Sequence, residues 1–237
     1  MITRRFIQRA KMLAFLEELE EAPAGGIRSL YLPHEEVENT LPVMPTELAA
    51  PAAKSPTGAV LFQGHDVSYL ILPPFPITEK STTPEFFTRP LSSLLQRDYM
   101  IALVLVRLGA YAIGISQGDD IVSSKVGTGN IHGRHRQGGS SAHRFERHRD
   151  KQIEYFFTRV CQHAREQLEP QARSLDYIVY GGARTTLQLL LKQCSFLERL
   201  ATPALPPMLD IPEPRRATLE TSLRRLCSST VLEWRED

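Results

Sequence analysis

The chain has little cysteine, no long hydrophobic run and almost no net charge. Its three cysteines, Cys161, Cys194 and Cys227, are odd in number and widely spaced. They form no recognisable metal-ligand or redox pair, and we expect thiols that fill the core in a reducing compartment. The longest apolar stretch, at about 100–106, is far shorter than the roughly 20 residues that span a bilayer. We therefore expect a cytoplasmic protein with no membrane partner.

The N-terminus lacks an uninterrupted signal-peptide core, because Gln8, Arg9 and Lys11 break its apolar residues. The spacing predicts instead an amphipathic helix with these residues on one side: Phe6, Ile7, Ala10, Leu13, Leu16 and Leu19. Short strands are expected at 59–62 and 69–72, before a proline-rich connector. Residues 1–95 are interpreted as a small N-terminal α+β domain, a helix plus short strands.

Residues 96–237 predict a larger α/β domain. Three strand-like runs at 99–106, 110–116 and 121–126 indicate a meander. Helices and strands then alternate: helix 141–168, strand 176–180, helix 185–193, a last strand near 208–211 and a terminal helix 216–234. This order predicts a mixed sheet covered by helices, with a topology that resembles ribonuclease H.

Positive charge is concentrated in one segment although the whole chain carries only +1. Between Lys125 and Arg149 there are six Lys or Arg residues and one acid, so the segment carries +5 and the remainder −4. A polyanion is the natural partner of such a local field. The segment includes a glycine-rich loop, 127–140, in which Gly138 and Gly139 leave room for a close approach of the backbone.

The helix after this loop has two different halves. Apolar residues recur at helical spacing only in its C-terminal half: Ile153, Phe156, Phe157, Val160, Ala164 and Leu168. From 143 to 152 the only large apolar residue is Phe145. We therefore expect the N-terminal half to project into solvent, with Ser140 or Ser141 as its cap and an anion site at its first amides.

Each of these features also has an ordinary structural interpretation. A glycine doublet is usually a turn, and a run of charges is usually a solvated face. His132 and His135 lack a third ligand at useful spacing, so exposed histidines are favoured over a metal pair. Together, however, the features describe a glycine-rich cationic tip on a projecting helix, which folding alone does not explain.

Residues 98–200 resemble the middle domain of the archaeal and eukaryotic class-1 translation release factors, and the stretch from His132 to Phe145 carries the resemblance. That family carries His-Gly-Arg-Gly-Gly-Gln-Ser-Ala-x-Arg-Phe between a strand meander and a long helix. Here Gly138-Gly139 and Ser141-Ala142-x-Arg144-Phe145 match. Tyr177-Ile178-Val179-Tyr180-Gly181-Gly182-Ala183 and Leu209-Asp210-Ile211 are similar to later strands of the family.

The sequence departs from the release factors at the catalytic glutamine. Ser140 stands where that glutamine follows the glycines, and Gln137 precedes them. The Gln-Gly-Gly-Ser order is closest to the release-factor-like peptidyl-tRNA hydrolases of the VMS/ANKZF type and their bacterial relatives. No stop-codon-reading element is recognisable, and the length leaves no room for a third domain. A codon-independent hydrolase of ribosome rescue or quality control is therefore expected.

The resemblance implies hydrolysis of the ester between a nascent peptide and its tRNA. The implied catalytic residues are Gln137, Gly138, Gly139 and Ser140. Whether Gln137 or Ser140 lies at the ester stays open. The implied RNA-binding residues are Arg134, Arg136, Arg144, Arg147, Arg149, His132 and His135. The expected partners are the peptidyl-transferase centre of the large ribosomal subunit, its RNA and the CCA end of peptidyl-tRNA. No metal or organic cofactor is implied, and a monomer is expected.

Two other classes of function remain open from the sequence. One is a ribosome-binding rescue factor without catalysis, which the retained Gly-Gly and adjacent Gln137 argue against. The other is a nuclease, which would need carboxylates clustered on a metal. The candidate carboxylates are Asp98, Asp119, Asp120 and Asp176, and their positions at strand ends or turns do not favour it.

Overall fold

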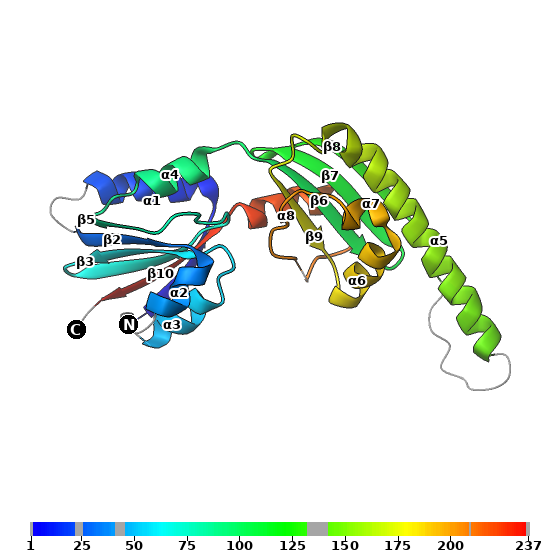
Figure 1. The fold of residues 1–237 in the computed structure, drawn as a ribbon, viewed down its shortest axis with the longest axis horizontal. Helices are drawn as coiled ribbons and strands as arrows, with labels where there is room; N and C mark the ends of the chain where they lie inside the picture. The colour runs from blue at the N-terminus through cyan, green and yellow to red at the C-terminus, as the bar shows by residue number, and fades with distance from the viewer. Residues whose placement is uncertain (1, 22–25, 41–45, 132–141, 209, 236–237) are drawn as a thin grey trace. The chain divides into compact units, whose positions relative to one another are not determined.

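The chain folds into two compact units. The computed structural model describes residues 2–21, 26–40, 46–131, 142–208 and 210–235 (Figure 1). One unit comprises Met1–Arg97 together with Arg224–Asp237, and the other is Asp98–Leu223. The predicted second domain, 96–237, is therefore wrong at its C-terminal end, because the last stretch of chain belongs to the first unit.

The first unit is built on a six-stranded antiparallel sheet with the order β1-β10-β4-β3-β2-β5. Its strands are β1 (Ile2–Ile7), β2 (Gly26–Leu32), β3 (Ala59–Gly64), β4 (Val67–Leu72), β5 (Ser81–Pro84) and β10 (Ser229–Arg235). β10 is paired on both edges, with β1 and β4. The terminal helix expected over 216–234 is thus wrong in its second half.

Alternation along β10 explains this correction. Val231 packs in the core on one face of the sheet, whereas Leu232 and Trp234 belong to the core on the other. A strand buried on both faces presents apolar residues at nearly every position, which resembles a helix by apolar content alone. The helix that does form, α8 (Arg216–Leu226), ends before this run.

Helices cover both faces of the first sheet (Figure 1). α1 (Arg9–Glu21) and α4 (Arg89–Gln96) contribute Met12, Leu16 and Leu91 to one core. α2 (His34–Thr40) and α3 (Thr46–Ala53) contribute to the other. The predicted N-terminal helix therefore begins late, since Phe6 and Ile7 lie in β1 and Phe6 is exposed.

The second unit contains a four-stranded mixed sheet with the order β8-β7-β6-β9. β6 (Met100–Arg107), β7 (Ala110–Gln117) and β8 (Asp120–Thr128) form the antiparallel meander, and β9 (Tyr177–Gly181) lies parallel to β6. The predicted mixed α/β fold is confirmed. Among the described residues of the strand expected near 208–211, Met208 forms an isolated bridge with Gly181, and the ribonuclease H-like topology stays a prediction.

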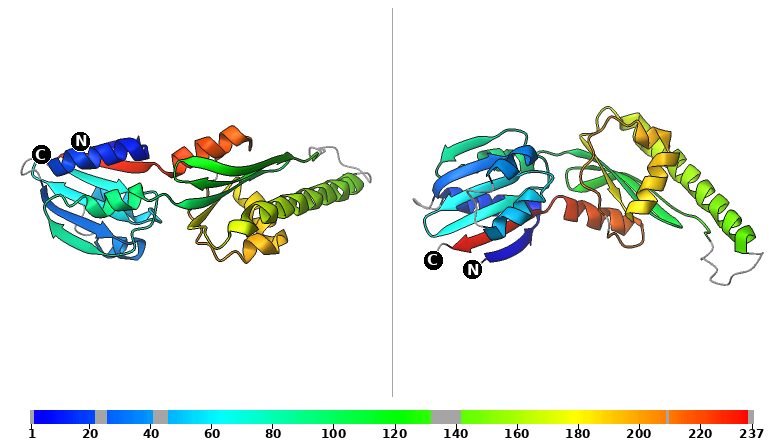
Figure 2. Two further views of the ribbon diagram at one scale, coloured as in Figure 1. Left: turned by 90° about the horizontal axis from the view of Figure 1, so that it is seen from above. Right: turned by 60° about the horizontal axis from the view of Figure 1, so that its bottom comes forward.

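Helices also lie on both faces of this sheet, as Figure 2 shows. α5 (Ala142–Leu168), α6 (Arg184–Gln193) and α7 (Ser195–Glu198) pack on one face, and the short 3-10 helix η2 (Glu169–Gln171) follows α5. α8 lies on the other face, where Leu219 packs over Gly114 of β7. No helix within the described ranges is long and apolar enough to cross a membrane.

A disulfide joins Cys161 of α5 to Cys194 at the end of α6. The two residues are 33 positions apart in the sequence, and their Cα atoms are 5.3 Å apart. The expectation of unpaired core-filling thiols is therefore wrong for these two, while Cys227 is buried and lies outside this disulfide. The pairing depends on how α5 and α6 pack on the sheet, which residue spacing alone does not indicate.

Reduction of this disulfide should lower the free energy of unfolding by about 2–4 kcal/mol, because the unfolded chain loses a cross-link. The measurement is urea unfolding with and without dithiothreitol. Cys161→Ser is the matched control and should show no response to the reductant. Alkylation of all three cysteines in the denatured, unreduced protein would contradict the pairing.

Candidate RNA-binding and catalytic site

Helix α5 is anchored on the sheet by its C-terminal half alone. Phe156, Phe157, Val160, Ala164 and Leu168 are all buried in the core formed with β6 and β7. Their spacing of three and four residues puts them on one face of the helix. A further contact joins Ser123 of β8 to Gln167 of α5, whose side-chain oxygens lie 2.7 Å apart. The predicted apolar stripe is therefore the one that docks.

The N-terminal half of α5 extends beyond this core (Figure 1). Between Arg144 and Tyr155 the structure describes no buried side chain, and these residues span about 18 Å at 1.5 Å per residue. The exposed cations are Arg144, Arg147 and Lys151, and Arg149 is half-buried. Two aromatic side chains are exposed among them, Phe145 at 52% and Tyr155 at 67%. A basic surface with open aromatic rings suits a nucleic acid.

The entry to the glycine-rich loop is held against α5. The amide N–H of Gly129 donates to the carbonyl of Gly109 at 2.9 Å, and Arg159 of α5 donates to the carbonyl of Thr128 at 3.3 Å. Ile131 is partly buried against the α5 core. The loop expected over 127–140 therefore begins later than predicted, because β8 runs to Thr128 and its exit is fixed to the helix.

Two glycines at this entry are required by packing. A Cβ on Gly129 would lie 2.5 Å from Cδ2 of Phe156, and one on Gly127 would collide with the hydroxyl of Tyr111. Phe156 and Tyr111 are both buried, and their rings contact each other edge to face. Because both rings are buried, Gly129 lets the exit of β8 lie against Phe156 of α5, and Gly127 leaves room for the ring of Tyr111 on β7.

Tyr111 links the sheet to α5 through its hydroxyl, which contacts Nδ1 of His163. Burial raises the pKa of Tyr111, against the opposing effect of the Arg159 guanidinium beside it. The phenol therefore stays protonated at neutral pH and is available as a donor to His163. Sequence reasoning did not single out Tyr111, Arg159 or His163. The sequence signal for Tyr111 was its type and position: it is an aromatic residue in a predicted strand of the meander that precedes the loop.

Most of the predicted site residues lie outside the described part of the chain. This applies to Gln137, Gly138, Gly139 and Ser140, the predicted catalytic residues. It also applies to four of the predicted RNA-binding residues: His132, Arg134, His135 and Arg136. The helical ones, Arg144, Arg147 and Arg149, lie together on the projecting half of α5.

The carboxylates considered for a nuclease do not form a metal-binding cluster among the described residues. Asp120 begins β8, and the side chain of Asp176 accepts a hydrogen bond from the amide of Met100 at 2.9 Å, which joins the start of β6 to the chain entering β9. Within the described ranges, no three His, Cys, Asp or Glu side chains gather as a metal site would require. Asp176 therefore has a structural role, because its carboxylate holds the start of β6.

Comparison with known proteins specifies the class of protein. Residues 99–232, more than half of the chain, match the family model described as the Actinobacteria/chloroflexi VLRF1 release factor. The chain belongs to this family. The predicted kinship with release factors is confirmed.

The curated relatives of the chain include peptide chain release factors. Peptide chain release factor subunit 1 of Aeropyrum pernix is 25% identical over 218 residues, covering 76% of this chain and 58% of the relative. That of Methanocaldococcus jannaschii is 34% identical over 119 residues, covering 48% and 28%. The chain thus spans less than two thirds of these relatives. The crystal structure of the archaeal translation termination factor aRF1 is similar over 92% of this chain and 73% of that one, with 19% identity and a TM-score of 0.41.

Replacing Gly129 by alanine should destabilise the protein by about 1–3 kcal/mol, because the added methyl group overpacks the buried Phe156. Urea unfolding measures the change. The same substitution in a Phe156→Leu background should cost less, since the smaller side chain leaves room. A double-mutant cycle without coupling between the two positions would contradict the proposed packing at the loop entry.

Proposed function

We propose that this protein is a codon-independent peptidyl-tRNA hydrolase that acts on stalled ribosomes in the cytoplasm. The observation that carries the proposal is the exposed basic half of α5, which follows directly on the Gly138-Gly139 sequence. Membership of a release-factor family implies hydrolysis of peptidyl-tRNA in general. The proposal adds the substrate, a stalled complex, and independence from a stop codon.

The basic half of α5 would bind the ribosomal RNA and the acceptor end of the tRNA. Its arginines lie on a helix whose other half is buried, so they are presented at a fixed distance from the core. Arginine forms paired hydrogen bonds with phosphate oxygens and stays charged at any physiological pH. Tyr155 and Phe145 add exposed rings on which unpaired bases stack.

Hydrolysis would take place at residues 137–140. The ester needs a positioned water and donors for the oxyanion that develops on its carbonyl. The side-chain amide of Gln137 and the backbone amides of the two glycines supply such donors without acting as acid or base. No step in this scheme draws on a metal or an organic cofactor.

The test is release of nascent peptide from purified ribosomal complexes that carry peptidyl-tRNA and no stop codon. Wild-type protein should release the peptide, and a stop codon in the complex should not increase the rate of release. Binding to these complexes without release would instead favour the non-catalytic rescue factor.

Reversing two exposed charges on α5, Arg144→Glu with Arg147→Glu, should greatly weaken ribosome binding and leave folding intact. The matched control is Arg184→Glu with Lys192→Glu, two exposed cations on α6. Cosedimentation over a salt series measures both. The wild-type affinity should fall steeply with salt, and the α5 variant should lose a slope of about 1 for each lost phosphate contact. Equal binding by both variants would contradict the assigned surface.

Gln137→Ala should lower the rate of peptide release by on the order of 10²–10³, the usual effect of losing one positioned oxyanion donor. Ser140→Ala should have a much smaller effect, because its hydroxyl is expected to cap α5. Neither change should alter ribosome binding. Normal release by Gln137→Ala together with an inactive Ser140→Ala would place the catalytic residue where the termination factors carry it.

A further inference from the structure

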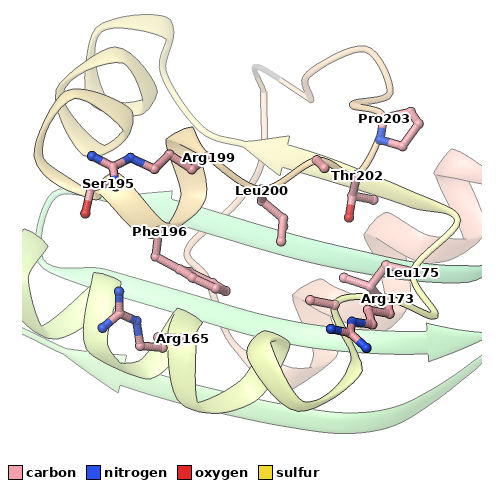
Figure 3. A pocket seen from close by; sticks show the side chains of 11 residues that line it. Arg165, Arg173, Leu175, Ser195, Phe196, Arg199, Leu200, Thr202 and Pro203 are labelled. Atoms are coloured by element: carbon pink, nitrogen blue, oxygen red, sulfur yellow. The ribbon is translucent and has the colours of Figure 1, made fainter.

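An open groove lies in the second unit on the surface formed by α5, α7 and the segments that flank β9 (Figure 3). Its volume is about 530 Å³, within the range of roughly 300–1,000 Å³ typical of ligand sites. All of its lining residues fall between 165 and 203, outside the basic half of α5 and outside the loop. The proposed hydrolase mechanism therefore leaves this groove without a role.

The floor of the groove is apolar. Its apolar lining residues are Leu175, Phe196, Leu200 and Pro203, together with Ala172 and Ala201. Leu175 is almost fully buried, whereas Phe196 and Leu200 are half-buried and so remain accessible from the groove. Polar side chains on the floor are limited to the hydroxyls of Ser195 and Thr202. Such a floor gains most from burying carbon atoms of a ligand.

Three arginines line the groove, and no acidic residue does. Arg165 comes from α5, Arg173 from the segment before β9 and Arg199 from the turn after α7. All three are exposed, and the structure describes no ion pair for any of them among the residues that it covers. Arg165 lies over the ring of Phe196 at 5.6 Å. Guanidinium groups beside an apolar lining suit a ligand that carries both carboxylates and apolar side chains.

The walls of the groove are held in place before any ligand binds. The disulfide joins Cys161, one helical turn before Arg165, to Cys194, which directly precedes Ser195. On the other side, the carbonyl of Pro203 accepts from the amide of Ile178 at 2.9 Å, and the amide of Leu205 donates to Ile178 at 2.8 Å. A groove that is already formed loses little conformational freedom on binding.

We propose that this groove binds an acidic peptide segment of a partner protein, with apolar side chains on the floor and carboxylates on the three arginines. Acidic segments are commonly recognised by such arginine clusters. RNA fits the site less well, because the single aromatic ring of the lining, Phe196, has Arg165 over it and the aliphatic floor offers bases almost no hydrogen-bonding groups.

The test uses fluorescence anisotropy with the full chain and a labelled peptide in which Leu and Phe alternate with pairs of Asp and Glu. Saturable binding is expected. Arg173→Glu with Arg199→Glu should weaken it at least tenfold, whereas the α6 control, Arg184→Glu with Lys192→Glu, should leave it unchanged. Circular dichroism and thermal unfolding establish that both variants are folded.

Changes in the peptide separate the two parts of the site. Replacing its acids by Lys should abolish binding, and replacing its Leu and Phe by Ser should weaken it at least tenfold. A labelled uridine oligomer should bind both arginine variants equally well. The proposal is overturned if the acidic peptide does not bind, if the Ser peptide binds as tightly, or if the groove variant loses the oligomer and keeps the peptide. Because no ribosome is present, these outcomes are independent of peptide release.

Discussion

The apolar contact between the C-terminal half of α5 and the β6–β7 face of the sheet supports the candidate functional features of the second unit. Each large side chain buried there, such as Phe157 or Leu168, contributes about 1.5–3 kcal/mol relative to exposure to water. A helical stretch such as residues 144–155, which has no fully buried side chain, is only marginally stable alone. The docked half therefore supplies the free energy that keeps the exposed half helical.

The same contact sets where both candidate surfaces lie. Arg159, one position before the buried Val160, reaches the carbonyl of Thr128 and so fixes the exit of β8. Arg165, one position after the buried Ala164, lines the groove. The basic half, the loop entry and the groove are thus positioned by one helix, and a change that loosened its docking would disturb all three together.

The sequence predicted the second unit well and the first unit poorly, for physical reasons. A period of 3.6 residues distinguished the docked half of α5 from its basic half, because only one face is apolar. β10 has no such period, since Val231 and Trp234 are buried on opposite faces, and its partners β1 and β4 are far away in the sequence. The Cys161–Cys194 disulfide and the groove likewise require residues that only tertiary packing brings together.

The glycines between 127 and 139 are needed for two different physical reasons, which the sequence alone does not distinguish. By sequence, Gly127, Gly129 and the Gly138-Gly139 doublet belong to one class of flexible loop residues. In the structure the first two occupy places where buried rings leave no space for a Cβ. Substituting them therefore lowers the stability of the folded protein, because the added side chain disturbs the packing. For the doublet, the proposed hydrolysis requires close approach of backbone to the ester, which is a requirement of the bound state. Substitutions of Gly127 or Gly129 should thus act first on stability, whereas under the proposed function those of Gly138 or Gly139 should act on the rate of release.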